Sequence, residues 1–218
     1  WFFEHLGRFK FSYVLGNLGP DQDHPWDFFT GIEFAYKPWS WFEITLGHVM
    51  QFGGEGSTSM NFGSSLQEFF GFIPYLSQSR QGGANKITEA NGRFFIDPWM
   101  GLQIYIDYAC DDSNTGSLKA YEKHFTQNSS WRLGLYSTRF LNSVADSLRA
   151  EFVITAPIAY RHGEFANGWT ENGAIIGDAL GPDGKRIELE WSHDWRQNNR
   201  PWATTLTTAW EMTDNYWY

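Results

Sequence analysis

The sequence predicts an all-β chain, an antiparallel meander that forms part of a transmembrane outer-membrane β-barrel. Three observations support this prediction. Apolar and polar side chains alternate along most segments, long and short connections alternate between those segments, and the composition is rich in aromatic residues and glycine. The wall of such a barrel places lipid against every second side chain and water against the others, which accounts for the alternation.

The composition excludes several other classes of protein. The chain has 218 residues, a formal net charge of -9, 19% aromatic residues and one cysteine, Cys110. No run reaches the roughly 18 consecutive apolar residues that a transmembrane helix needs. A single cysteine excludes a disulfide framework, and the acidic charge argues against nucleic acid as a partner. The first four residues (WFFE) lack the basic and long apolar regions of a signal peptide, so a mature chain or an internal fragment is expected.

Alternation with a period of two predicts the strands in order along the chain. In residues 27–37, Phe34 and its apolar neighbours two positions away share one face, whereas Glu33 lies on the other. The same sorting recurs in 41–52, 102–110, 185–195 and 202–212. The complete set of expected strands is 7–18, 27–37, 41–52, 86–97, 102–110, 130–138, 147–156, 185–195 and 202–212. Most of these have the length of about 9–11 residues with which a tilted strand crosses a bilayer.

The connections between these strands alternate regularly in length. The expected connections are 19–26, 38–40, 53–85, 98–101, 111–129, 139–146, 157–184 and 196–201. A meander whose two ends face different compartments has tight turns on one side and elaborated loops on the other, whereas a β-sandwich with Greek-key crossings has no reason to alternate in this way. The pattern therefore favours a barrel over a sandwich.

Tryptophans recur at the short turns, namely Trp39, Trp41, Trp99, Trp195 and Trp202. Amphipathic indoles where strands meet turns are typical of the interfacial girdle of a membrane barrel. The alternative interpretation is that these indoles fill one end of an ordinary soluble core.

The count of nine strands is odd, whereas complete bacterial barrels have an even number. Residues 1–218 are therefore expected to be a single but incomplete β-barrel domain. A further strand in 157–164 would change the count by one.

Several short motifs, in order, carry a resemblance to a known family. These motifs are Pro38–Gly47 (PWSWFEITLG), Gln51–Gly56 (QFGGEG), Gly92–Phe94 (GRF), Tyr160–His162 (YRH) and Ile176–Asp183 (IGDALGPD). Over roughly residues 5–195 the chain resembles the Wzi-type capsule assembly proteins. The resemblance implies an outer-membrane barrel of roughly eighteen strands, of which this chain would be the later half. It also implies a lectin without catalytic chemistry, which binds capsular polysaccharide and aids capsule assembly. Asp178 stands where the family pattern leads us to expect histidine.

The acidic residues allow one catalytic alternative. Glu188 and Glu190 share one face of a strand, and a glycosidase needs two carboxyl groups about 5–9.5 Å apart. Acidic side chains that line a wet lumen are the commoner explanation of such a face. The six histidines have no metal-binding spacing, and Asp111–Asn114 lacks the pattern of a calcium-binding loop, so we expect neither a metal nor any other cofactor.

The longer loops are the expected place for binding, because they combine aromatic faces with hydrogen-bonding groups. The candidate polysaccharide-binding residues are Tyr121, Lys123, His124, Tyr160, Arg161, His162 and Trp169. The alternative is that these loops fold back to close the mouth of the barrel and bury their aromatic side chains.

The sequence as a whole predicts a non-catalytic, monomeric barrel in the bacterial outer membrane. Its expected partners are capsular polysaccharide or another surface glycan, and outer-membrane lipid. Three alternatives remain open, namely a porin-like channel, a secreted glycoside hydrolase and a soluble β-sandwich lectin. Conductance, sugar release and solubility without detergent would distinguish them.

Overall fold

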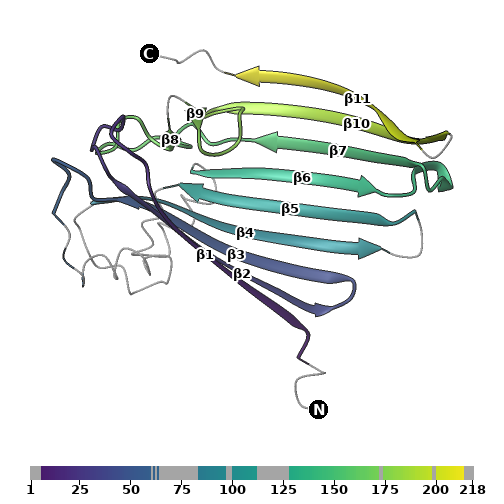
Figure 1. Cartoon of the computed structure of the whole chain (residues 1–218), viewed down its shortest axis with the longest axis horizontal. Helices are drawn as coiled ribbons and strands as arrows, with labels where there is room; N and C mark the ends of the chain where they lie inside the picture. The colour runs from purple at the N-terminus through teal and green to yellow at the C-terminus, as the bar shows by residue number, and fades with distance from the viewer. Residues whose placement is uncertain are drawn as a thin grey trace.

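The chain folds into one large antiparallel sheet and one small one (Figure 1). The computed structural model describes residues 6–59, 61, 63, 83–96, 100–111, 128–171, 174–197 and 200–213. The large sheet contains β1 (Arg8–Asn17), β2 (Phe28–Trp39), β3 (Phe42–Phe52), β4 (Ala84–Ile96), β5 (Leu102–Asp111), β6 (Ser129–Ser137), β7 (Asp146–Ile154), β10 (Gly184–Gln197) and β11 (Arg200–Thr213). The small sheet pairs β8 (Thr170–Glu171) with β9 (Ala174–Ile175), and a 3₁₀ turn, η2, spans Phe140–Asn142. No helix within the described ranges is long and apolar enough to cross a membrane.

The strand order of the large sheet is that of a simple meander. Each strand pairs antiparallel with its neighbour in sequence, from β1 to β7 and then to β10 and β11. This order confirms the predicted fold class, and the nine expected strands appear with small shifts at their ends. The expected strand ending at residue 37 continues through Pro38 because the register of β2 with β3 shifts between Tyr36 and Trp39. Such an irregularity tolerates proline, which has no N–H for the ladder.

The segment between β7 and β10 differs from one possibility raised by the sequence. No strand forms in 157–164, where the turn at Ala159–Arg161 is closed instead by backbone hydrogen bonds to Ala156 and Ile158. The short β8–β9 hairpin follows, and it lies outside the large sheet. This segment therefore does not add a tenth strand to the wall.

Long and short connections leave opposite ends of the sheet, as predicted. The long connections 18–27, 53–83, 112–128 and 155–183 start and finish at the end on the left of Figure 1. The strand ends that the short connections join, from β2 to β3, β4 to β5, β6 to β7 and β10 to β11, lie at the other end. We call these the loop end and the turn end of the sheet.

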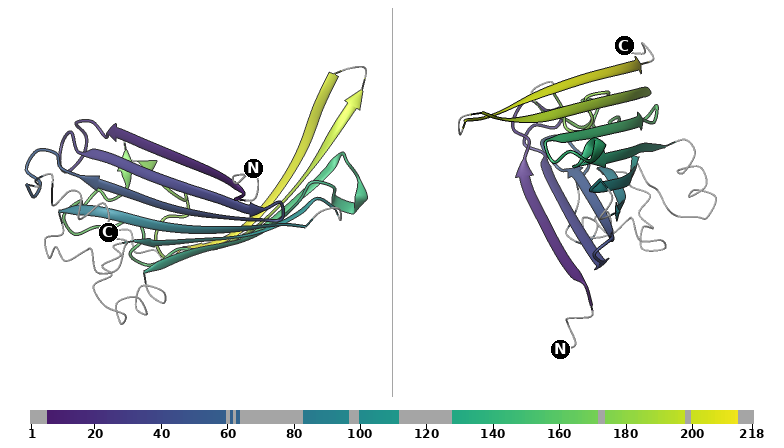
Figure 2. Two further views of the ribbon diagram at one scale, coloured as in Figure 1. Left: turned by 90° about the horizontal axis from the view of Figure 1, so that it is seen from below. Right: turned by 90° about the vertical axis from the view of Figure 1, so that its right-hand side faces the viewer.

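The sheet is a curved, open wall (Figure 2), and the side chains on its two faces differ in chemistry. Apolar side chains on the outer face are widely exposed, and Phe11 and Leu206 are 67% and 66% exposed. Each of the nine strands of the large sheet contributes exposed large apolar residues. In the described part of the chain no second sheet covers this face, so Ile32, Phe34 and Tyr36 project from the outside of the wall. The inner face carries most of the charged residues, which pair across neighbouring strands.

The buried core lies at the loop end, on the inner side of the wall. The largest fully buried side chains there are Trp169 and Phe165, both 1% exposed, and both come from the segment between β7 and β10. In Figure 2 the β8–β9 hairpin lies inside the curve of the sheet. The hydrophobic core therefore forms between the wall and one folded-back connection.

Tryptophans of the turn end are exposed on the wall. Trp39 stacks on Trp41 with ring centroids 5.2 Å apart, and Trp195 stacks on Trp202 at 4.9 Å. These four side chains are between 41% and 56% exposed. They do not fill a soluble core, and their position fits an interfacial girdle.

Candidate functional site

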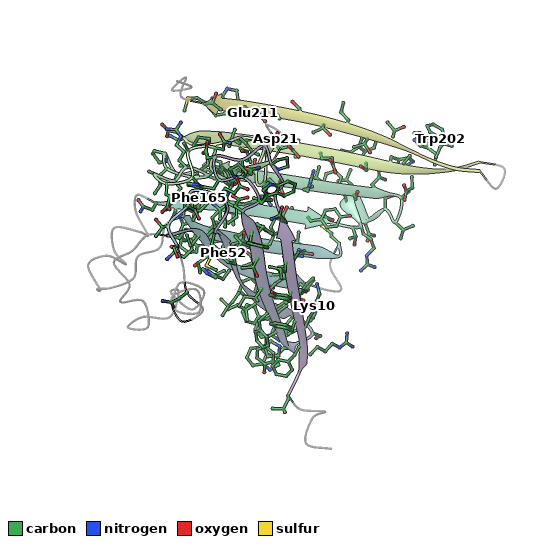
Figure 3. The ribbon with its side chains drawn as sticks, turned by 60° about the vertical axis from the view of Figure 1, so that its left-hand side comes forward. Lys10, Asp21, Phe52, Phe165, Trp202 and Glu211 are labelled. Atoms are coloured by element: carbon green, nitrogen blue, oxygen red, sulfur yellow. The ribbon has the colours of Figure 1, made fainter. Side chains whose placement is uncertain are left out.

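The segment 155–183, which we call the inner loop, folds into the concave side of the wall at the loop end. Two other long connections hold it there. The amide of Thr58 donates a hydrogen bond to Glu164 Oε1 at 2.7 Å, and Gln22 Nε2 donates to the Thr170 carbonyl at 2.9 Å. The ring of Phe165 meets His24 edge-on at 5.2 Å. Figure 3 shows Phe165 in the dense group of side chains at this end, far from Trp202.

His24 lies at the centre of these contacts. Its Nδ1 is 3.2 Å from the Glu55 carbonyl oxygen, and its Nε2 is 3.1 Å from the Glu164 carbonyl oxygen. Both contacts are hydrogen bonds only when both ring nitrogens carry a proton, because a carbonyl accepts and cannot donate. The ring therefore lies where three long connections meet, namely its own (18–27), the one that contains Glu55 and the inner loop.

The carboxylate of Glu164 is well stabilised in its ionised form. Burial acts to raise the pKa of Glu164, but hydrogen bonds from Thr58 and the nearby rings of His24 and His162 outweigh burial and lower it. The contact between Glu164 and Thr58 is thus between a carboxylate and an amide, which is stronger than a neutral hydrogen bond.

Asp178 anchors the far part of the inner loop to the wall. Its two carboxylate oxygens accept hydrogen bonds from Arg186 of β10 at 3.1 and 3.2 Å, and Oδ2 also accepts one from Arg132 of β6 at 2.8 Å. Burial acts to raise the pKa of Asp178, but the Leu180 amide and the two guanidinium groups lower it overall. The expected histidine could not make this paired contact with two arginines, so aspartate here has a structural reason.

Tyr160 fixes the middle of the inner loop. Its backbone N–H donates to Asp111 Oδ2 at 2.6 Å, and its hydroxyl oxygen accepts from the Asp178 amide at 2.9 Å. Burial raises the pKa of Tyr160, so the phenol is neutral. A Cβ atom at Gly168 or Gly177 would overlap Tyr160, which explains glycine at these two positions.

A cavity of about 460 Å³ remains between the inner loop and the wall, and we call it the luminal cavity. Its floor comes from the inner faces of β2 to β7, and its roof from Tyr160, Trp169 and Ile176–Asp178. The polar and charged lining residues on the strands are Glu89, Asn91, Arg93, Asp107, Asp111, Ser130 and Arg132. The half-buried Phe29 supplies aromatic surface, and the buried ring of Trp169 meets it edge-on at 5.8 Å. The cavity thus combines aromatic surface with hydrogen-bonding groups of both kinds.

Some buried polar atoms of the lining have no hydrogen-bond partner among the described residues. They include Trp169 Nε1, Asp107 Oδ1 and Arg132 Nε. Buried polar groups are normally satisfied by protein, water or ligand, since an unsatisfied one costs about 1–3 kcal/mol. These atoms are buried behind the cavity surface, so the hydrogen-bonding groups that face its interior are the other polar atoms of the lining.

A ladder of ion pairs crosses the inner face beside the cavity. Arg149 Nη2 lies 3.0 Å from both Glu188 Oε1 and Glu190 Oε2. The pair considered above for glycoside hydrolysis thus shares one guanidinium group. Tyr105 also donates a hydrogen bond to Glu151 in this ladder. Among the described residues no group of three or more His, Cys, Asp or Glu side chains is placed to hold a metal ion.

The predicted site residues divide into three groups. Tyr160 and Trp169 line the luminal cavity. Arg161 and His162 lie in the same loop but outside the lining, and His162 Nδ1 accepts hydrogen bonds from the Glu164 and Phe165 amides. Tyr121, Lys123 and His124 lie outside the described residues.

The strand residues of the cavity are absent from the sequence-based set of candidates. Glu89, Asp107 and Arg132 belong to strands, whereas the search for binding residues considered only loops. Alternation assigns these three to the inner face, and this signal identifies them as water-facing. It does not identify which of the many inner-face residues lie under a folded-back loop.

An antiparallel meander with an apolar outer face, a charged inner face and a loop folded against that inner face defines the wall of an outer-membrane type of β-barrel. The family model of the capsule assembly protein Wzi matches residues 1–204. The chain therefore belongs to the Wzi capsule assembly family.

One solved structure is similar over most of the chain. It is Wzi of Escherichia coli, described as an outer membrane protein involved in group 1 capsule assembly and as a carbohydrate-binding β-barrel. The match has a TM-score of 0.68 and 20% sequence identity, and it covers 96% of this chain and 44% of that chain. The present chain thus spans less than half the length of that structure. No curated protein sequence matches the chain significantly.

Proposed function

We propose that this chain is part of an outer-membrane β-barrel that binds capsular or another surface polysaccharide and aids capsule assembly, without catalysing a reaction. Membership of the Wzi family and the described carbohydrate binding of the E. coli protein support the proposal. The observation that carries it is the luminal cavity, whose lining combines Phe29, packed on the buried Trp169, with Asp107, Asn91 and other hydrogen-bonding groups. Sugars bind where apolar ring faces and directional polar groups converge.

The proposal includes the surroundings of the chain. The exposed apolar outer face and the tryptophans of the turn end favour outer-membrane lipid as a partner. The sheet is open in the structure, which supports a single β-barrel domain in which these nine strands form about half of a monomeric barrel. The net charge of -9 disfavours nucleic acid. A repeating polymer would bind more tightly than one of its units, because the binding of one unit raises the effective concentration of the others near the protein.

The rival functions make different predictions about the inner face. A porin-like channel requires an open polar path, whereas here the inner loop is fastened across part of the lumen by Asp178 and Tyr160. A glycosidase built on Glu188 and Glu190 would need a carboxyl group free to donate a proton, whereas both accept hydrogen bonds from Arg149. Both observations favour binding.

The proposal is tested by measuring binding of purified capsular polysaccharide to the intact protein in detergent. Trp169→Ala removes the buried ring that packs on Phe29 in the roof of the cavity, and we expect at least about tenfold weaker binding. Trp202→Ala, at the turn end, is the matched control and should bind as the wild type does. Trp169→Phe retains the contact with Phe29 and covers the case in which Trp169→Ala unfolds the inner loop. Equal binding by all four proteins would contradict a site in the luminal cavity.

A further inference from the structure

We propose that His24 is a pH-dependent latch, which fastens the inner loop over the luminal cavity while both of its ring nitrogens carry a proton and loosens it when one proton is lost. The inference concerns access to the cavity from the loop end. It goes beyond the proposed function, because it holds whatever ligand the cavity takes. It follows from the groups that surround the His24 ring, which lies between three long connections.

The surroundings of the His24 ring offer an acceptor at each nitrogen. Nδ1 lies 3.2 Å from the Glu55 carbonyl oxygen, and Nε2 lies 3.1 Å from the Glu164 carbonyl oxygen. The ring is half-buried and packs edge-on against the buried Phe165. A neutral imidazole has one N–H and one lone pair, so it donates to only one of these carbonyls and turns its lone pair toward the other. Only the doubly protonated ring makes both contacts.

Carboxylates surround His24 on its own connection and on the two that it meets. Asp23 and Asp27 belong to the same connection, Glu164 belongs to the inner loop, and Glu55 contacts the ring through its backbone. Burial acts to raise the pKa of Asp27 and of Glu164, and attraction to the His24 ring acts to lower both. The second proton on the ring therefore enters an environment of negative charge.

His162, also on the inner loop, has the opposite requirement. Its Nδ1 accepts hydrogen bonds from the amides of Glu164 at 3.2 Å and Phe165 at 3.4 Å, so this nitrogen carries no proton. A second proton on His162 therefore weakens the inner loop as the pH falls, whereas loss of a proton from His24 weakens it as the pH rises. The two effects are separable, because a substitution at one ring leaves the other in place.

The ionic contacts of the inner loop persist near neutral pH. The pKa values of Glu164 and Asp178 are both lowered, so these carboxylates stay ionised and keep their contacts with Thr58 and with two arginines. Histidine ordinarily changes its charge between about pH 5 and 8. Because the fastened loop requires the second proton on His24, the fastened state loses stability as the pH rises through this range. The segment from Glu164 to Trp169, which ends in the cavity roof, is then held less tightly.

The test follows hydrogen exchange in residues 162–169 of the full chain in detergent, from about pH 5.5 to about pH 8.5, the range that spans the ordinary titration of histidine. Each rate is divided by the intrinsic rate at the same pH. The wild-type protection factor should fall at least about threefold as the pH rises, since one hydrogen bond is lost. His24→Gln retains a donor for one carbonyl and does not titrate, so its protection should start lower and not fall further. His193→Gln, which removes a titrating ring bonded to Asp146 at the turn end, is the matched control and should retain the wild-type decrease.

NMR of the ring nitrogens in isotope-labelled wild-type protein measures the protonation of His24 directly, so the test does not depend on the folding of a variant. We expect both nitrogens to be protonated at the acidic end of the range and one at the alkaline end, with the loss of protection following this titration. The latch is wrong if wild-type protection does not fall, if the fall persists in His24→Gln, or if His24 loses its proton without any change in protection. None of these results bears on polysaccharide binding, which is measured separately at a fixed pH.

Discussion

Individual side chains decide whether the inner loop stays on the wall, and Asp178 is the clearest case. Its carboxylate meets two guanidinium groups, from Arg132 and Arg186, which belong to different strands. A lowered pKa in the folded state means that this contact stabilises the protein above the ordinary pKa of aspartate. The stabilisation is lost as the pH falls through the lowered folded pKa.

We therefore expect the protection factors of residues 155–183, which compare the observed hydrogen exchange with the intrinsic rate at the same pH, to be high at pH 7 and to fall on acidification to about pH 3. Asp178→Asn should lower these protection factors at pH 7 already, since removing one partner of this contact costs on the order of 2 kcal/mol. Asp183→Asn is the control, because Asp183 lies in the same loop and forms no ion pair within the described part of the chain. If the inner loop is equally protected from hydrogen exchange in the Asp178 and Asp183 variants, Asp178 does not hold this loop on the wall.

Gly134, on the inner face of β6, is a second position at which one side chain decides the packing. A Cβ atom at Gly134 would overlap the ring of Tyr105, which crosses the wall to reach Glu151. Gly134→Ala should therefore destabilise the protein by about 1–3 kcal/mol. Gly16→Ala is the control, because open space surrounds that position. Thermal unfolding followed by circular dichroism compares the two, and equal midpoints would refute the predicted packing.

At the scale of the element, each strand of the large sheet carries side chains for two different environments, one on each face. Leu206 lies on the outer face of β11 and is 66% exposed, and Thr207 lies beside it on the inner face. If the outer face contacts hydrocarbon, Leu206→Lys should cost about 2–4 kcal/mol near the middle of the bilayer. Thr207→Lys places the same charge in water and should cost little. Folding into phospholipid vesicles under a urea titration measures both, and equal costs would argue against a lipid-facing outer wall.

At the scale of the whole molecule, the alternation of connections implies that the loop end and the turn end face different compartments. Asp21 at the loop end and Ser40 at the turn end are both exposed. In intact cells a membrane-impermeant maleimide should label Asp21→Cys but not Ser40→Cys, and membrane disruption should expose the second. The native Cys110 is buried, so it should add little background. Labelling of both variants in intact cells would contradict the transmembrane arrangement.

The amino-acid sequence by itself determined the strands, their order and the two faces of the wall. A strand carries its own signal in the alternation of residues such as Glu33 and Phe34, and short antiparallel connections leave one plausible order. It also indicated the family through motifs such as Tyr160–His162, and it selected Tyr160 and Trp169 as candidate binding residues.

Only the tertiary structure decided where the candidate site lies. The inner loop has no periodic pattern, so its path depends on contacts distant in sequence, such as Gln22 with Thr170 and Arg132 with Asp178. These contacts bring Glu89 and Asp107 under Trp169 and create the cavity. Local alternation indicates whether a residue faces lipid or water. A cavity forms where segments distant in sequence pack against each other, and a local pattern carries no information about that packing.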